Sequence, residues 1–118
     1  MAKGDELLDR LINFAVMVIR FCSRLPKTYE GRHIAQQLLR SGTAPAPHYG
    51  EARSAESTKD FLHKLKLALK EMNESKVWIE IVRRSEMLSE KGVVGIATEC
   101  DELCKILNAS VSKVRSKM

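Results

Sequence analysis

Apolar residues recur along the first part of the chain at the three- and four-residue spacing of an amphipathic helix. This face consists of Leu8, Leu11, Ile12, Ala15, Val18, Ile19, Cys22 and Leu25. A second apolar group, Phe14, Met17 and Phe21, widens the face until only a narrow polar stripe is left. The pattern predicts a helix over residues 5–25, which Pro26 ends. Because so broad an apolar face favours contacts outside a single bundle, we predict that Phe14, Met17 and Phe21 lie at a subunit interface.

Two prolines interrupt the next amphipathic segment. Ile34, Ala35, Leu38 and Leu39 predict a helix from about residue 29, but Pro45 and Pro47 follow within it. A proline inside a helix removes a backbone donor and clashes with the preceding turn, whereas a proline at a helix start is tolerated. We therefore expect a helix over residues 29–50 with a kink or break near 43–47. Pro45 either opens a new helical turn capped by Thr43 or bends the existing helix.

Two longer amphipathic segments complete the chain. Ser57-Thr58-Lys59-Asp60 matches a capping box and predicts the start of a helix over residues 57–89. After Lys91-Gly92, a clean apolar stripe from Val93 to Val114 predicts a last helix over 93–116. Four amphipathic helices with short connections predict an all-α, antiparallel, up-down-up-down four-helix bundle that occupies residues 1–118 as one domain.

Composition narrows the class of protein. The chain has 118 residues, of which 44% are hydrophobic and 30% charged, and no apolar run approaches the roughly 18 residues of a membrane span. Acidic residues precede the first hydrophobic stretch, a pattern unlike that of a signal peptide. We expect a cytoplasmic protein without a membrane contact.

The three cysteines lie within apolar patterns, which favours reduced, buried thiols over disulfides. Cys100 and Cys104 are one helical turn apart and face the same way. They leave open a minor alternative, a metal site or thiol sensor, which would need two more ligands. The histidines, His33, His48 and His63, do not have metal-binding spacing, and no cofactor is expected.

The middle of the chain resembles a known family. The stretches Gln37 to Pro45, Tyr49 to Ala52 and Ala55 to Glu71 are similar to the bacterial four-helix bundle proteins, also called 23S ribosomal RNA intervening-sequence proteins. The resemblance extends over about residues 11–107. It implies an up-down bundle that assembles into a five-fold ring and has no established enzymatic activity. It also implies a relation to the accessory proteins of diversity-generating retroelements, which bind nucleic acid and a reverse transcriptase.

The family motif, as it stands in this sequence, consists of Arg40, Ser41, His48, Glu51, Asp60 and Phe61. Pro45 occurs in one branch of the family. Pro47-His48 stands where Ala-Asn is usual, so the chain departs from the pattern at His48.

Basic residues segregate on the predicted third helix. Lys59, Lys66, Lys70 and Arg84 share a sector 100° to 140° from the apolar seam, and Glu56, Asp60, Glu71 and Glu74 adjoin it. The chain end adds Lys113, Arg115 and Lys117, which complement the dipole of the last helix. Such cations neutralise nucleic-acid phosphates, so we predict that these seven residues bind nucleic acid. The alternative is an ordinary solvated face.

Trp78 and Ile81 project away from the apolar seam of the same helix. An exposed tryptophan is typical of binding hot spots, so we assign both residues to the subunit interface. The alternative is that Trp78 packs within the monomer under a chain terminus.

Acid–base chemistry has one candidate set in the sequence: His48, Glu51, Asp60 and His63. No nucleophile, phosphate loop or oxyanion site accompanies it, and helix capping explains Asp60. We expect Glu51 to pair with Arg40 or Arg53 and predict that the protein is not an enzyme.

The sequence thus favours a homo-oligomer, a pentamer by resemblance, that associates with RNA or DNA as a sequence-tolerant scaffold or accessory protein. A protein–protein adaptor without nucleic-acid binding stays open, with a reverse transcriptase or another protein as its partner.

Overall fold

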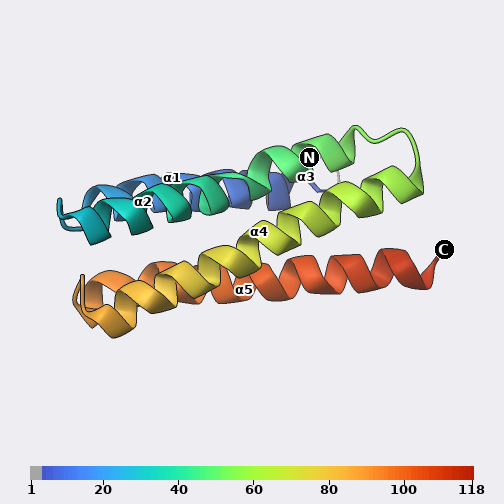
Figure 1. Ribbon diagram of the computed structural model, residues 1–118. Coiled ribbons are helices and arrows are strands. Elements are labelled where there is room, and N and C mark those ends of the chain that lie inside the picture. The colour runs from blue at the N-terminus through green and yellow to red at the C-terminus, as the bar shows by residue number, and fades with distance from the viewer. Residues whose placement is uncertain (1–3) are drawn as a thin grey trace.

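Five helical segments make up the computed structural model, which describes residues 4–118. They are α1 (Asp5–Ser23), α2 (Tyr29–Thr43), α3 (Pro45–Arg53), α4 (Thr58–Ser85) and α5 (Glu90–Ser116). Because α2 and α3 follow one another as two arms of a bent helix, the chain runs up, down, up and down along the molecule (Figure 1). The predicted all-α four-helix bundle is confirmed, and residues 4–118 contain no strand.

The bend between α2 and α3 accommodates both prolines. Ala44 keeps helical backbone angles (φ −76°, ψ −35°), so the chain changes direction without leaving the helical region. Pro45 and Pro47 fall at the first and third positions of α3. The first N–H groups of a helix have no partner within it, so neither proline removes a hydrogen bond from α3. Thr43 does not cap α3, because its hydroxyl donates to the Leu39 carbonyl oxygen at 2.6 Å.

Two helix ends differ from the positions predicted by the sequence. α4 ends at Ser85, and α5 begins at Glu90. The residue that terminates α4 is Glu86, whose left-handed backbone (φ 57°) is the geometry usually supplied by glycine. Gly92, which suggested the helix end, lies inside the first turn of α5. The predicted start of α4 is confirmed, since the Ser57 hydroxyl accepts a hydrogen bond from the Asp60 N–H at 3.0 Å.

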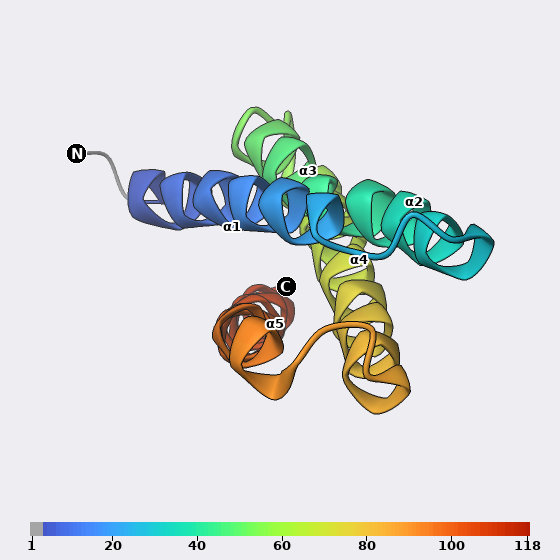
Figure 2. The same cartoon turned by 90° about the vertical axis from the view of Figure 1, so that its left-hand side faces the viewer.

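The helix α4 packs against α2, α3 and α5. Figure 2 shows α5 nearly end-on beside it. The core between the helices is formed by apolar residues of all five segments. α1 and α2 approach closely at Gly42, where an added Cβ would lie 2.6 Å from Val18 Cγ2. Within residues 4–118 no helix is both long and apolar enough to cross a bilayer.

The core includes two residues that the sequence assigned to a subunit interface. Phe14 and Phe21 are 0% exposed in the monomer, so they have no surface to offer a second chain. That assignment is wrong for both, because α1 packs against α2, α3 and α5 and buries a wider arc than one neighbour would cover. Met17 is half-buried.

Candidate nucleic-acid and subunit-contact surfaces

Charged side chains join α2 to α4. The Arg40 guanidinium donates to the Glu71 carboxylate at 3.0 Å and also pairs with Glu74. Glu74 additionally accepts from the indole N–H of Trp78 at 3.0 Å. Arg40 is therefore engaged within the fold and is not available to pair with Glu51 as the sequence suggested.

A buried hydroxyl pair lies beside this network. The Ser41 and Ser75 hydroxyl oxygens are 2.9 Å apart, and both residues are 0% exposed. The Ser75 hydroxyl is also 3.0 Å from the carbonyl oxygen of Glu71. Both hydroxyls thus have partners, as buried polar groups require, and they fix the contact between α2 and α4.

The pair His48 and Glu51 faces Lys64 of α4. His48 Nδ1 and Lys64 Nζ each lie 3.7 Å from a carboxylate oxygen of Glu51. Arg53, the other partner considered for Glu51, pairs with Asp5. His48 Nδ1 is buried and finds no hydrogen-bond partner among the described residues. The separation of 3.7 Å between His48 and Glu51 is longer than the roughly 2.6–3.2 Å of a direct hydrogen bond between a base and its partner.

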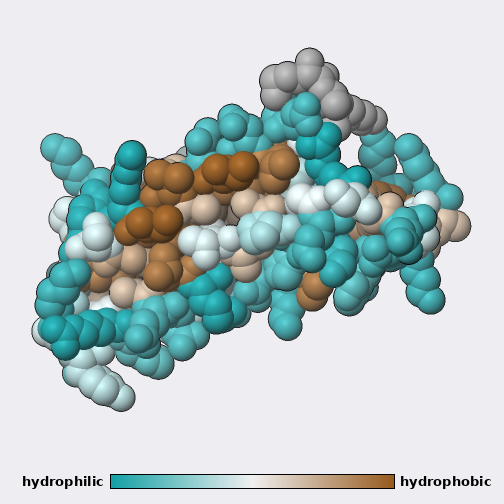
Figure 3. All heavy atoms as spheres, turned by 90° about the horizontal axis from the view of Figure 1, so that it is seen from above, coloured by the Kyte–Doolittle hydropathy of each residue, from teal (hydrophilic) through white to brown (hydrophobic). Residues whose placement is uncertain are grey.

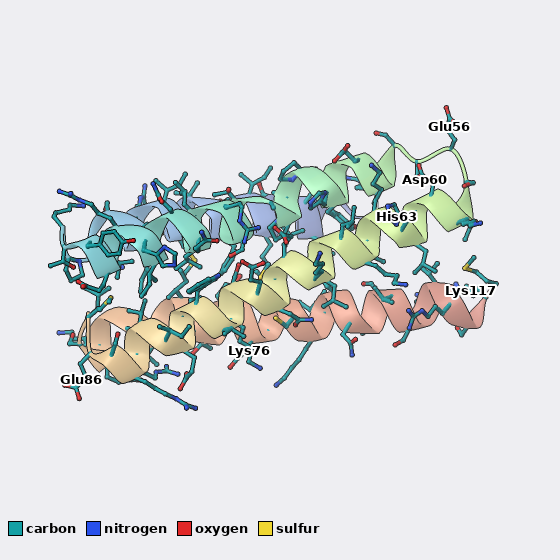
Figure 4. All side chains as sticks on the ribbon, viewed as in Figure 1. Glu56, Asp60, His63, Lys76, Glu86 and Lys117 are labelled. Carbon is teal, nitrogen blue, oxygen red and sulfur yellow. The ribbon has the colours of Figure 1, made fainter. Side chains whose placement is uncertain are left out.

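The predicted cations of α4 and the chain end share one half of the bundle. Lys59, Lys66 and Lys70 are exposed on α4, and Lys113, Arg115 and Lys117 are exposed on the last turns of α5. The end of α5 packs beside the start of α4, where Phe61, Val114 and Lys117 line one cleft. Figure 4 shows Lys117 at the same end of the molecule as Glu56, Asp60 and His63. Within residues 4–118 none of these six cations, which we call the basic half, forms an ion pair.

Arg84 does not continue the basic half. Its guanidinium is 2.9 Å from Glu80, one helical turn earlier. The exposed apolar residues Val77 and Ile81 separate it from Lys70. At 1.5 Å per residue, Arg84 lies about 21 Å along the helix from Lys70. Of the four cations predicted as one stripe, the structure brings together only the first three.

Among the described residues, exposed large apolar side chains other than Tyr29, Val94 and Met118 fall into two groups. The first, the α1 strip, consists of Ile12, Val16 and Ile19, which are 46%, 38% and 53% exposed, with Leu39 of α2. Figure 3 views the molecule from the side on which α1 and α2 lie and shows hydrophobic side chains gathered on that face. The second, the α4 strip, consists of Val77 and Ile81. Apolar side chains grouped in this way are typical of contact surfaces.

Trp78 lies next to the α4 strip but packs within the monomer. Its ring meets His33 of α2 edge-to-face, with centroids 6.1 Å apart, and its indole N–H is bonded to Glu74. The side chain is half-buried against α2. Trp78 therefore has partners within the monomer, and its neighbour is α2 and not a chain terminus; its place at a subunit interface stays a prediction.

All three cysteines are buried and free. Burial raises the pKa of Cys22 to about 11. Interaction with Cys104, together with burial, raises the pKa of Cys100, whereas interaction with Cys100 lowers the pKa of Cys104 against the opposite effect of burial. Both directions follow from an interaction that stabilises the Cys104 thiolate. Among residues 4–118 no three His, Cys, Asp or Glu side chains gather as a metal site.

A family model described as 23S rRNA-intervening sequence protein matches residues 6–109. The chain belongs to this family. A crystal structure of a protein of unknown function from the S23 ribosomal protein family of Bacteroides thetaiotaomicron VPI-5482 is 32% identical to it, with a TM-score of 0.82. The alignment covers 88% of this chain and 96% of that protein. No protein of curated function matches the chain.

In this member of the intervening-sequence protein family, the motif residues connect the bent helix α2–α3 to α4. Arg40 and Ser41 bond to α4 side chains, and Glu51 faces Lys64. Asp60 lies in the first turn of α4, and Phe61 packs against the core near the end of α5. Glu51 thus faces Lys64 and not Arg40 or Arg53, the partners expected from the sequence.

Sequence reasoning missed a second group of cations. Arg20 of α1, Arg24 directly after α1 and Lys91 of α5 line a cleft of about 540 Å³. None of the three forms an ion pair with another described residue, and Arg24 lies over the Phe21 ring at 5.8 Å. Helical periodicity could not predict this group, because periodicity relates residues within one helix, whereas these cations come from two different parts of the bundle.

Proposed function

We propose that this protein is a non-catalytic, homo-oligomeric helical bundle that binds RNA or DNA through its phosphates without reading the base sequence. The observation that carries the proposal is that six exposed cations gathered in one half of the bundle are not used in ion pairs within the described part of the fold. Arg10, Arg40, Arg53 and Arg83 are used in ion pairs within the fold. The six cations of the basic half are exposed and form no ion pair with other described residues.

Exposed lysines and arginines that form no ion pair within the protein favour contact with phosphates. Each phosphate that a cation neutralises releases a condensed counterion, so affinity falls steeply with salt. Backbone contacts position a protein on a nucleic acid but carry no sequence information. The basic half therefore supports sequence-tolerant binding.

The apolar strips support the oligomer. The α1 strip and the α4 strip are different surfaces, so a contact between one on a first copy and the other on a second copy would be heterologous. Heterologous contacts that close produce rings, which agrees with the five-fold ring implied by the resemblance. A ring would also repeat the basic half around its circumference. The same strips favour the second candidate, an adaptor that binds another protein such as a reverse transcriptase.

The double substitution Lys66→Gln/Lys70→Gln tests the basic half. We expect binding to duplex DNA at 0.1 M salt to weaken about 60-fold, and the slope of log affinity against log salt to fall by about 1.8, because two phosphate contacts are lost. Single-stranded RNA should show a smaller change of slope, about 1.4. Fluorescence anisotropy with labelled RNA and DNA at several salt concentrations measures both quantities.

The matched control is Arg20→Gln/Arg24→Gln, which removes two exposed, unpaired cations from the opposite half. Its affinity should stay within about threefold of the parent protein. Equal losses in the two variants would mean that net charge alone drives binding. A loss confined to the control would place the ligand in the cleft between α1 and α5, and a parent protein that binds nothing at low salt would leave the adaptor as the function.

The substitution Ile19→Asp tests the α1 strip. Ile19 is 53% exposed, so a charge there leaves the monomer folded but has to be desolvated in any contact between copies. We expect light scattering to show a shift from the oligomer towards the monomer, with an unchanged circular dichroism spectrum. Asn13→Asp, at an exposed polar position of the same helix, should retain the parent mass. An Ile19→Asp oligomer of full mass would exclude the α1 strip from the interface.

A further inference from the structure

Two sulfur atoms are in contact between α4 and α5, and a third lies one helical turn away on α5. Met72 Sδ of α4 lies 3.8 Å from Cys100 Sγ of α5. Cys104 follows one helical turn after Cys100 and is buried on the same face of α5. Met72 and Cys100 are 0% and 1% exposed, and Cys104 is 8% exposed. The fold thus places two thiols and a thioether together in a nearly dry environment.

The separation of the sulfur atoms fits a metal ion. Metal–sulfur bonds in proteins are about 2.3 Å long, so three sulfur ligands in a trigonal plane lie about 4 Å apart. The observed Met72–Cys100 distance of 3.8 Å is close to that value. Thiolate and thioether ligands together select Cu(I), which accepts few ligands, whereas structural zinc almost always takes four.

We propose that Met72, Cys100 and Cys104 form a three-coordinate Cu(I) site. Binding forms two copper–thiolate bonds and one copper–thioether bond. The two S–H bonds break, and their protons pass to the solvent. Copper enters and stays as Cu(I), so nothing is oxidised or reduced.

The surroundings provide an entry path and a counter-charge. A cavity of about 270 Å³ between α4 and α5 reaches Cys100 and is lined by Lys76 and Asp101 as well. Lys76 and Asp101 form an ion pair at 3.3 Å, and Figure 4 shows Lys76 on the side of α4 that faces α5. Two thiolates and Cu(I) carry one net negative charge, and the ammonium group of Lys76 lies at the same cavity as Cys100. This site does not depend on nucleic-acid binding.

Titration of the reduced, metal-free protein with Cu(I) under anaerobic conditions tests the proposal, with bicinchoninate as a coloured competitor. We expect one Cu(I) per chain. Cys104→Ser should weaken binding at least about 100-fold and Met72→Leu about 10-fold, since each loses a ligand. X-ray absorption of the copper complex should show three sulfur neighbours in the parent protein and two in Met72→Leu.

The remaining cysteine provides the control. The thiol of Cys22, on α1, bonds to the Ala35 carbonyl oxygen at 3.5 Å, and Cys22→Ser should bind Cu(I) like the parent protein. Failure to compete with bicinchoninate, or equal weakening by Cys22→Ser and Cys104→Ser, would show adventitious thiol binding and overturn the proposal. Three sulfur neighbours in Met72→Leu would also overturn it. Cys104→Ala, compared by thermal melting, provides a variant without a buried hydroxyl.

Discussion

Gly31→Ala is expected to lower the free energy of unfolding by about 3 kcal/mol or more, from overpacking and the loss of a helix cap. A Cβ at this position would lie 2.0 Å from the carbonyl oxygen of Pro26 and 2.9 Å from its carbonyl carbon. Both atoms belong to the backbone, so no side-chain rotation relieves the contact. The connection between α1 and α2 would have to move, and the hydrogen bond from the Gly31 N–H to the Thr28 hydroxyl, now 3.1 Å, would be disturbed.

Gly50→Ala is the matched control for this prediction. Gly50 lies within α3, and an added Cβ there meets no atom within 4 Å. Alanine should therefore stabilise the protein by about 0.5–1 kcal/mol, because it restricts the unfolded chain and favours the helix. Urea unfolding followed by circular dichroism compares the two variants. Effects of the same sign would contradict the close contact between Gly31 and Pro26.

The number and direction of the helices could be predicted because each helix carries its own periodic signal. The bend at Ala44 illustrates the limit of that signal. Two nearby prolines indicated a break, but their cost depends on which helical position each one occupies. In the structure Pro47 falls at the third position of α3, where its missing N–H would have had no partner. The end of α4 is a similar case, because Glu86 adopts a backbone conformation that sequence patterns associate with glycine.

Helical rotation placed Lys59, Lys66 and Lys70 correctly on one exposed face, since all three belong to α4. The same method grouped Arg84 with them, because rotation ignores the distance along the axis. Helical rotation does not predict contacts between helices. The partners of Arg40 and the pairing of Ser41 with Ser75 depend on how α2 crosses α4.

The cysteines of α5 show the same difference between relations within one helix, which the sequence predicts, and contacts between helices, which it does not. The spacing of Cys100 and Cys104 was visible in the sequence, but the third sulfur comes from Met72 on another helix. A search for His or Cys near the two thiols therefore finds no further ligand. Only the packing of α4 against α5 reveals a thioether at a suitable distance.

The correction at Phe14 leads to the second large effect. Phe14→Ala should lower the free energy of unfolding by about 3–5 kcal/mol, since it removes an aromatic side chain from a fully packed position and leaves a cavity. The expected loss is large because Phe14 is 0% exposed. Small domains are stable by about 5–15 kcal/mol, so the variant should still fold at low temperature. Urea unfolding at a protein concentration low enough to dissociate any oligomer isolates the monomer's contribution.

The neighbouring residue Ile12 provides the comparison, because it lies on the same helix but is 46% exposed. Ile12→Ala should cost the dissociated chain less than about 1 kcal/mol, because the side chain gives up little buried area. Its effect should instead grow with protein concentration if the α1 strip contacts another copy. Phe14→Ala should show its full loss at every concentration. The reverse pattern, a Phe14 effect seen only in the oligomer, would return Phe14 to the interface and contradict the core described for α1.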